Sequence, residues 1–282
     1  MIGHFAILTA TVLLLSNAEA LTMIGLIILG VALFWGWRVY ARTKQRTGHV
    51  AMPMNTKELL QAHVAFYRQL NADQQLVFEN RIKDFLQRVA ITGIGTTVGN
   101  LDRILIASGA IMVIFSFPDW RYNNISEVLL YRDAFSEDYQ LQGNDRNILG
   151  MVGDGAMKGQ MILSQPSVRA SFQHPHDGHN TVIHEFVHLL DKADGATDGI
   201  PDYLLQRPFL LPWIQHMHQT IQEMKQNQSR DIDFYGATND AEFLAVVSEY
   251  FFERPDELKS KHRELYQLLE QMFHPSSQIQ HP

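Results

Sequence analysis

The 282-residue chain contains no cysteine, and this absence narrows the chemistry open to it. Without thiols there is no disulfide scaffold and no thiolate metal site, so a bound metal would need histidine, aspartate or glutamate ligands. Basic residues are also scarce, since 23 Lys and Arg stand against 30 Asp and Glu and give a net charge of −7. A general nucleic-acid-binding protein needs a basic face, so no nucleic-acid partner is predicted. The 46% of hydrophobic residues is typical of an ordered globular protein with a sizeable core.

Charge is nearly absent from the first 37 residues, where Glu19 is the one charged side chain. They contain two apolar runs, at 2–16 and 21–37, each near the lower limit of length that spans a bilayer. Basic residues follow the second run: Arg38, Arg42, Lys44 and Arg46. By the positive-inside rule this cluster stays on the cytoplasmic side. We therefore predict that residues 1–37 form a hydrophobic membrane anchor of one or two helices, which contacts the membrane through residues 21–37.

The first apolar run has two interpretations, and the residues leave both open. It is either the first arm of a helical hairpin or a cleaved signal peptide, because "AEA" at 18–20 has small residues where cleavage would occur. The signal peptide is the weaker interpretation, because no Lys or Arg precedes the run. Both place the rest of the chain in the cytoplasm, at the inner membrane if the source is a bacterium. Two buried core helices are disfavoured, because a basic linker at 38–54 follows in place of further domain.

From Asn55 onward, apolar residues recur at helical spacing. Asn55 and Asn71 are predicted to cap two successive helices. The second helix is predicted to bury a stripe of five apolar side chains: Leu76, Phe78, Ile82, Phe85 and Leu86. Residues 104–117 predict a buried helix, since the run is too short for a membrane span. Further helical patterns continue to about residue 273, so the domain is predicted to be mostly helical.

Two short segments favour β-strands, residues 127–132 and 159–164. The second is a candidate edge strand that could pair with an extended peptide, although an ordinary inner strand fits it equally well. Together with the helices, these strands predict an α+β domain over residues 55–275, mostly helical with a small sheet. A polar tail, residues 276–282, ends the chain.

The stretch "HEFVHLLD", residues 184–191, contains the pattern His-Glu-x-x-His. On a helix, His184 and His188 lie about one turn apart on the same face, so both can reach one zinc ion at about 2.0–2.1 Å. Glu185 is offset to one side, where its carboxylate can take a proton from water. Apolar neighbours would bury this polar trio, a costly arrangement that usually has a reason. Two histidines at this spacing can also be hydrogen-bonded core residues, so the pattern alone does not decide.

A catalytic zinc site needs a third protein ligand and an open position. The acidic candidates downstream are Asp191, Asp198, Asp202, Glu242, Glu249 and Glu253. Asp191 follows His188 by three residues and is better placed to accept a ring N–H from a ligand histidine. The last three candidates lie near one face of a single predicted helix, because separations of 7 and 11 residues are close to whole turns. Helical periodicity does not choose between Glu242 and Glu249.

"HEFVHLLD" together with "YGATNDAEFLAVVSEYFF", residues 235–252, resembles the Mlc titration factor A family of zinc-dependent peptidases. More distantly it resembles the catalytic domain of anthrax lethal factor. The resemblance covers roughly residues 55–275 and implies a zincin-like fold of the gluzincin kind. It implies that one Zn²⁺ per chain is held by three ligands: His184, His188 and Glu242. It further implies Glu185 as the general base and Tyr235 as a hydroxyl facing the substrate carbonyl. Asp191 and Glu249 are then expected to be hydrogen-bond partners of the ligands.

These features predict a zinc metallopeptidase that hydrolyses bonds in a peptide or protein substrate. The alternative is a membrane-tethered regulatory protein that binds a partner, with little or no peptidase role. The resemblance implies such a partner, a glucose-responsive transcriptional repressor. A purely structural zinc site would fill its fourth position with protein and would not need Glu185, which favours the enzyme.

Overall fold

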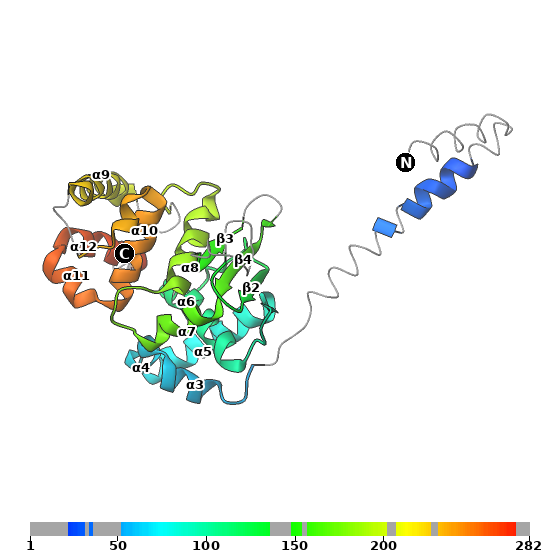
Figure 1. Cartoon of the computed structure of the whole chain (residues 1–282), viewed down its shortest axis with the longest axis horizontal. Coiled ribbons are helices and arrows are strands. Elements are labelled where there is room, and N and C mark those ends of the chain that lie inside the picture. The colour runs from blue at the N-terminus through cyan, green and yellow to red at the C-terminus, as the bar shows by residue number, and fades with distance from the viewer. Residues whose placement is uncertain are drawn as a thin grey trace, which may run out of the picture. The chain divides into compact units, whose positions relative to one another are not determined.

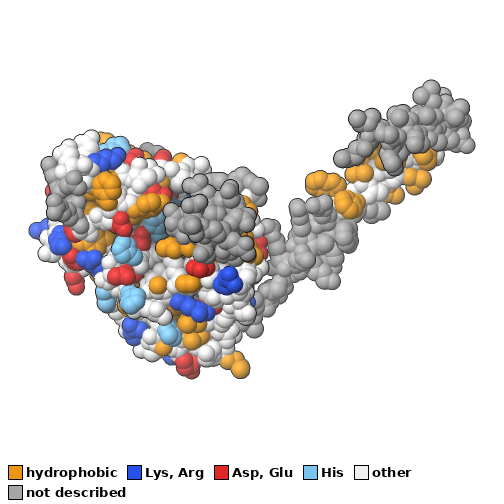
Figure 2. All heavy atoms as spheres, viewed as in Figure 1, with side chains coloured by type: hydrophobic (Ala, Val, Ile, Leu, Met, Phe, Trp, Pro, Cys, Tyr) orange, Lys and Arg blue, Asp and Glu red, His pale blue; other side chains and the backbone are white. Residues whose placement is uncertain are grey.

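The computed structural model describes residues 22–31, 34–35, 52–135, 148–153, 157–201, 207–226 and 231–274. The chain divides into two units, Met1–His49 and Val50–Pro282. In the first unit, residues 22–31 and 34–35 are helical (Figure 1). Their large apolar side chains are exposed (Figure 2).

Among the described residues, no helix combines the length and the hydropathy needed to cross a membrane. The apolar run at 2–16, most of the basic linker at 38–54 and the tail at 276–282 lie outside the described residues. The membrane anchor at 1–37 therefore stays a prediction.

In the second unit, four strands of the described residues form one sheet in the order β1-β2-β4-β3. Strands β1 (Ala90–Ile94), β2 (Glu127–Tyr131) and β4 (Gln160–Ser164) are parallel, and β3 (Gly150–Val152) pairs antiparallel with β4. The two predicted strands are both present. However, β4 lies between β2 and β3. Of the two interpretations of 159–164, the inner strand is therefore confirmed and the edge strand is wrong. Four successive residues of β4 are buried, as expected for an inner strand covered on both faces.

The N-terminal helices of this unit are α3 (Thr56–His63), α4 (Ala65–Gln69), α5 (Ala72–Arg88) and α6 (Asn100–Val113). Asn71 caps α5 as predicted, because its side chain accepts the N–H of Gln74 and the Gln74 side chain accepts the N–H of Asn71. Asn55 precedes α3 but makes no side-chain cap.

The predicted stripe on α5 holds for Phe78, Ile82, Phe85 and Leu86, which are buried. Leu76 is the exception, with 58% of its surface exposed. It precedes Phe78 by two residues, a turn of about 200°, which carries it to the opposite face of the helix. Including Leu76 in the buried stripe was therefore wrong.

Helix α6 corresponds to the predicted buried helix at 104–117 and packs against α8 (Thr181–Asp191). Gly109 makes this approach possible, because a Cβ there would lie 2.4 Å from Cγ1 of Val182. On its other sides α8 contacts β3 and α10 (Asp240–Glu253), so it runs between the sheet and α10 (Figure 1). This central position places the His-Glu-x-x-His segment against both elements.

The remaining elements surround this centre. Helices α9 (Arg207–Lys225), α11 (Pro255–Lys261) and α12 (Arg263–Phe273) pack on α10, and α7 (Gln165–Gln173) packs on α6 and α8. A 3₁₀ turn, η2 (Lys192–Asp194), follows α8, and another, η3 (Phe234–Ala237), precedes α10. The described part of the chain thus matches the predicted class, α+β and mostly helical with a small sheet.

Candidate metal centre

Helix α8 carries the two histidines of the motif. It begins at Thr181 and is capped by Asn180. The Asn180 side chain accepts the N–H of Ile183 at 3.0 Å, which satisfies one free donor of the first turn. Its apolar residues are buried, so they fix the rotation of the helix: Val182, Ile183, Phe186, Val187, Leu189 and Leu190. This rotation leaves His184, Glu185 and His188 on the side that meets β3 and α10.

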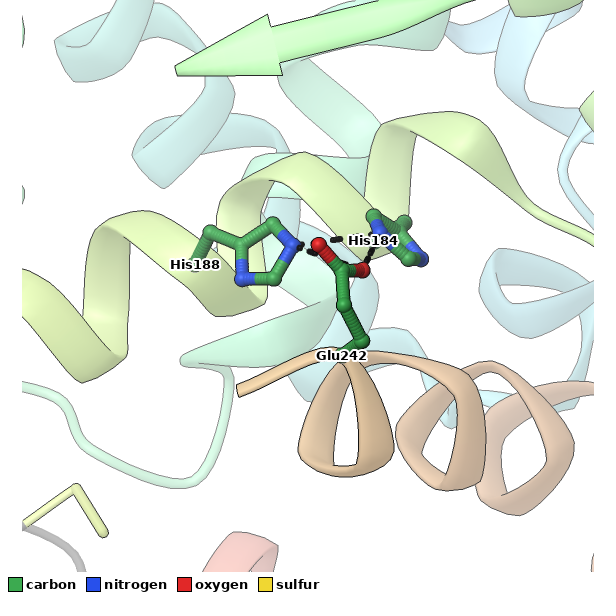
Figure 3. Close-up of side chains that lie close together, drawn as sticks. All are labelled: His184, His188 and Glu242. Carbon is green, nitrogen blue, oxygen red and sulfur yellow. Dashed lines mark hydrogen bonds and ion pairs between the residues drawn. The ribbon is translucent and has the colours of Figure 1, made fainter. Parts of the chain in front are cut away.

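Helix α10 supplies the acidic partner. Asn239 caps it by accepting the N–H of Glu242 at 2.9 Å, which places Glu242 in the first turn. The rest of the helix is mostly apolar and buried. Glu242 therefore projects from a rigid helix end toward α8, as Figure 3 shows.

Three potential ligand atoms converge between the two helices (Figure 3). Nε2 of His184 lies 3.0 Å from Oε2 of Glu242 and 3.1 Å from Nε2 of His188. Nε2 of His188 lies 3.4 Å from the same carboxylate oxygen. Around a tetrahedral zinc ion, bonds of about 2.0–2.1 Å separate neighbouring ligand atoms by about 3.3–3.4 Å. The spacing of the two nitrogens and the oxygen therefore fits a small tetrahedral ion.

The hydrogen bonding of His184 points the same way. Its Nδ1 lies 2.7 Å from Oε1 of Glu249, and an ionised carboxylate only accepts, so Nδ1 donates. In neutral His184 the lone pair of Nε2 then faces Glu242 and His188. A single proton can bridge only one pair of these atoms, whereas a metal ion between them would satisfy all three.

The electrostatics of the cluster favour a positive charge at this point. Burial lowers the pKa of His184, but hydrogen bonds with Glu242 and Glu249 outweigh it and raise that pKa to about 10. Burial raises the pKa of Glu242, but contacts with the two histidines outweigh it and lower that pKa to about 2. The His184 shift comes from the carboxylates beside it and the Glu242 shift from the two imidazoles. A metal cation would be stabilised by the same carboxylates.

Glu185 lies beside the cluster and is 5% exposed. Its Oε2 has no hydrogen-bond partner among the described residues, and burial raises its pKa. Gly150 of β3 lies against it, since a Cβ on Gly150 would be 2.6 Å from Oε1 of Glu185. The absence of a side chain at Gly150 therefore makes the space that this carboxylate occupies.

A cleft of about 770 Å³ opens over the three converging side chains. One wall is β3, with Gly150, Met151 and Val152, and the other is formed by the start of α10 and Tyr235. Tyr235 is half exposed, and its ring centroid lies 6.0 Å from that of His184. Burial raises its pKa, and the charges of Glu242 and Glu185 raise it further, so its hydroxyl keeps its proton.

Asp191 does not make the hydrogen bond expected of it. Nδ1 of His188 and Oδ1 of Asp191 are buried, and neither has a partner among the described residues. Oδ2 of Asp191 instead accepts the N–H of Gly199 at 2.9 Å. Asp191 therefore holds the loop after α8.

The other described candidate ligands, Asp198 and Glu253, are not among the converging groups. Asp198 accepts the N–H of Ile200 and lines the cleft, and Asp202 lies outside the described residues. Glu253 accepts from Gly178 and Asn180 and is not among the converging groups. Among the described residues, the group of His, Asp and Glu side chains that could hold a metal ion consists of His184, His188 and Glu242.

The sequence did not reveal the parts played by Gly150 and Asn180. A strand of three residues such as β3 gives no alternating pattern long enough to find. Asn180 did have a signal, because Asn directly before "TVIHEF" is a typical helix N-cap.

Comparison with known proteins identifies the class of protein. Residues 37–274 match the model of the family described as "Glucose-regulated metallo-peptidase M90". The match covers most of the chain, so the chain belongs to this metallopeptidase family.

Individual relatives agree with this assignment. The uncharacterized protein slr2042 of Synechocystis sp. is 32% identical over 262 residues, 88% of this chain and 94% of that protein. Mlc titration factor A of Escherichia fergusonii is 28% identical over 187 residues, 60% of this chain and 68% of that protein. Its counterpart in Pectobacterium atrosepticum is 28% identical over 162 residues, 52% of this chain and 58% of that protein. The resemblance to the Mlc titration factor A family, predicted from two motifs, is thereby confirmed.

Proposed function

We propose that this chain is a zinc-dependent peptidase whose ion is held by His184, His188 and Glu242. The observation that carries the proposal is the convergence of two imidazole nitrogens and one carboxylate oxygen at 3.0–3.4 Å. Zinc prefers such ligands in tetrahedral sites, and catalytic zinc sites use three protein ligands and leave one position open. The open position would face the cleft lined by β3 and Tyr235.

When bound there, zinc would acidify water to a pKa near 7 and polarise the carbonyl of a peptide bond. Glu185 is placed to accept the proton of the attacking water, because its carboxylate is buried beside the cluster and Oε2 is not engaged. Its raised pKa suits a group that also returns the proton to the leaving amine. The protonated hydroxyl of Tyr235 would donate to the carbonyl oxygen as charge develops there.

We propose that an extended substrate pairs with β3. Among the described strands β3 is at an edge of the sheet, and its residues line the cleft over the candidate metal site. Pairing of this kind supplies affinity through main-chain hydrogen bonds. Strand β3 thus takes the peptide-pairing role for which the sequence made 159–164 a candidate.

The test uses the purified full-length chain. We expect about one zinc per chain by atomic emission, and zinc-dependent cleavage of a peptide library. Glu185→Gln should keep the zinc and lose the cleavage, because the base is removed and the ligands remain. Glu58→Gln, an exposed glutamate on α3, is the matched control and should change neither. No zinc under metal-replete conditions would overturn the site, and cleavage by Glu185→Gln would overturn the mechanism.

The names of the relatives support a second candidate function, the binding of a regulatory protein. Several are called Mlc titration factor A, which suggests an interaction with the regulator Mlc. In a strain lacking this gene, the Glu185→Gln protein separates the two functions. Rescue of the deletion phenotype would favour the binding role, and failure to rescue would favour the peptidase.

Attachment to a membrane through residues 21–37, with the peptidase domain in the cytoplasm, remains part of the proposal. It rests on the apolar run and on the basic residues that follow it. Extraction of membranes with alkaline carbonate tests it. The full-length chain should stay in the pellet, and release into the supernatant would contradict the anchor.

A further inference from the structure

Behind His184, two buried carboxylates of α10 meet one asparagine at the start of α8. The backbone N–H of Asn180 donates to Oε2 of Glu249, and its side-chain Nδ2 donates to Oε1 of Glu253 at 3.0 Å. The three residues are buried, with 2% to 6% of their surface exposed. This buried group lies away from the cleft and takes no part in the proposed reaction.

The group is connected to the candidate metal ligand by an unbroken series of hydrogen bonds. Oε1 of Glu249 accepts from Nδ1 of His184 at 2.7 Å, while Oε2 of the same carboxylate accepts from Asn180. The series therefore runs from Glu253 through Asn180 and Glu249 to His184. It joins residues of α10 to residues of α8 that are 65 to 73 positions apart in the sequence.

Asn180 is held at every polar atom of its side chain. Oδ1 accepts the N–H of Ile183, and Nδ2 donates to Glu253 at 3.0 Å and to the carbonyl of Ser171 at 3.3 Å. Glu253 is fixed in turn, because its Oε2 accepts the N–H of Gly178 at 3.0 Å. These contacts fix the position of the backbone N–H that Asn180 donates to Glu249.

We propose that Asn180 and Glu253 are positioning residues for the metal ligand His184, acting through Glu249. The inference rests on the proposed zinc site. The hydrogen bond at one ring nitrogen sets the tautomer and orientation of a ligand histidine, and the partners of that bond matter for metal affinity. A buried network of this kind is effective because every member is satisfied in a surrounding of low polarity.

The substitution Asn180→Asp separates positioning from helix capping. Aspartate caps a helix as well as asparagine does, so the bond to Ile183 is kept. The second oxygen replaces the amide that donated to Glu253, so at pH 9, above the Glu253 pKa of about 8, two acceptors face each other. Asn71→Asp is the matched control, because Asn71 caps α5 in the same way and lies outside this network.

A double substitution tests the bond itself. In Asn180→Asp with Glu253→Gln, the donor moves to position 253 and the acceptor moves to position 180. The remaining oxygen at position 253 can still accept from Gly178, so the series of hydrogen bonds is restored with one bond reversed. The contact with the Ser171 carbonyl is not restored, so we expect partial recovery.

The readout is the zinc dissociation constant of the full-length chain at pH 9, where Glu253 is ionised, measured by competition with a chelator of known affinity. We expect Asn180→Asp to raise it about tenfold to a hundredfold, as is typical for loss of a ligand's hydrogen-bond partner. The double variant should recover part of that loss, and Asn71→Asp should match the parent. Thermal unfolding of each variant shows whether it is folded.

Two results would overturn the inference: an unchanged dissociation constant in Asn180→Asp, or a double variant as weak as the single one. If Asn180→Asp fails to fold, Glu253→Gln alone decides. In that variant an NH₂ group replaces one of the two oxygens that accept from Gly178 and Asn180, so it faces one of these donors. An unchanged zinc affinity in that variant would also overturn the inference. A parent chain that binds no zinc would overturn the proposed function instead.

Discussion

The two ends of helix α8 hold their histidines in different ways. At the first turn, Nδ1 of His184 donates to Glu249, which is held in turn by Asn180. At the last turn, Nδ1 of His188 has no partner among the described residues, and the nearby carboxylate of Asp191 is turned to Gly199. The two histidines of one motif therefore differ in how many hydrogen bonds hold their rings. The difference teaches that the motif specifies where the imidazoles project, while distant residues decide how firmly each one is held.

The largest effect is expected between the two ends, where Glu185 packs against Gly150 and its Oε2 has no hydrogen-bond partner among the described residues. In Gly150→Ala the new Cβ would lie 2.6 Å from Oε1 of Glu185, so the carboxylate must move. A displacement of about 1 Å in a catalytic group can cost about a hundredfold in rate. We expect a loss of that order in peptide cleavage, with the zinc content unchanged. Gly99→Ala is the control, because its Cβ would meet its nearest atom at 3.4 Å. Full activity of Gly150→Ala would show that the position of Glu185 is not critical.

The next effect is on zinc affinity, and it compares a carboxylate substitution at each end of α8. In Glu249→Gln an NH₂ group replaces one of the two oxygens that accept from His184 and Asn180. We therefore expect zinc affinity to fall about tenfold to a hundredfold. Asp191→Asn should leave it nearly unchanged, since Asp191 makes no hydrogen bond to His188 in the structure. Chelator competition measures both. Equal losses in the two variants would remove the asymmetry between the ends of α8.

The last prediction concerns the pH dependence of stability at the first end of the helix, which does not involve zinc binding or cleavage. Burial raises the pKa of Glu253 to about 8, outweighing the hydrogen bonds from Asn180 and Gly178 that lower it. The folded state then binds more protons than the unfolded state between the ordinary pKa of about 4.5 and about 8, so the contribution of Glu253 to stability falls as pH rises through that window.

Urea unfolding at pH 5 and pH 9 measures this contribution. Relative to Glu253→Gln, the parent chain should lose about 4 kcal/mol of unfolding free energy between the two pH values. The reason is that pH 5 lies about three tenfold steps below the folded pKa of about 8, and each step corresponds to about 1.4 kcal/mol. The variant cannot ionise at this position, so it serves as the reference. Parallel pH profiles of parent and variant would contradict the raised pKa of Glu253.

Much of the candidate site could be predicted because its signals are local. The spacing of His184 and His188 and the apolar letters around them define a buried helix, and the structure has that helix. No local signal in the sequence distinguished Glu242 from Glu249 as the third ligand. The choice of Glu242 came from the family resemblance, because both residues lie near the same helical face and spacing alone does not distinguish them.

The parts that the sequence could not predict depend on contacts between distant residues. Whether β4 is an inner or an edge strand depends on its pairing with β2 and β3, and no residue within 159–164 encodes that order. The link between Asn180 and Glu253 spans 73 positions and leaves no periodic signal. Leu76 was misplaced for a simpler reason, since its offset of two residues from Phe78 already predicts the other face of α5.

The most direct test of the account is zinc K-edge X-ray absorption on the zinc-loaded, full-length chain. We predict four-coordinate zinc with two imidazole nitrogens at about 2.0–2.1 Å and oxygen in the remaining positions. The Glu242→Ala variant should lose zinc or replace that carboxylate oxygen with a ligand from solvent. A spectrum with fewer than two imidazole ligands, or a chain that takes up no zinc, would contradict the central claim.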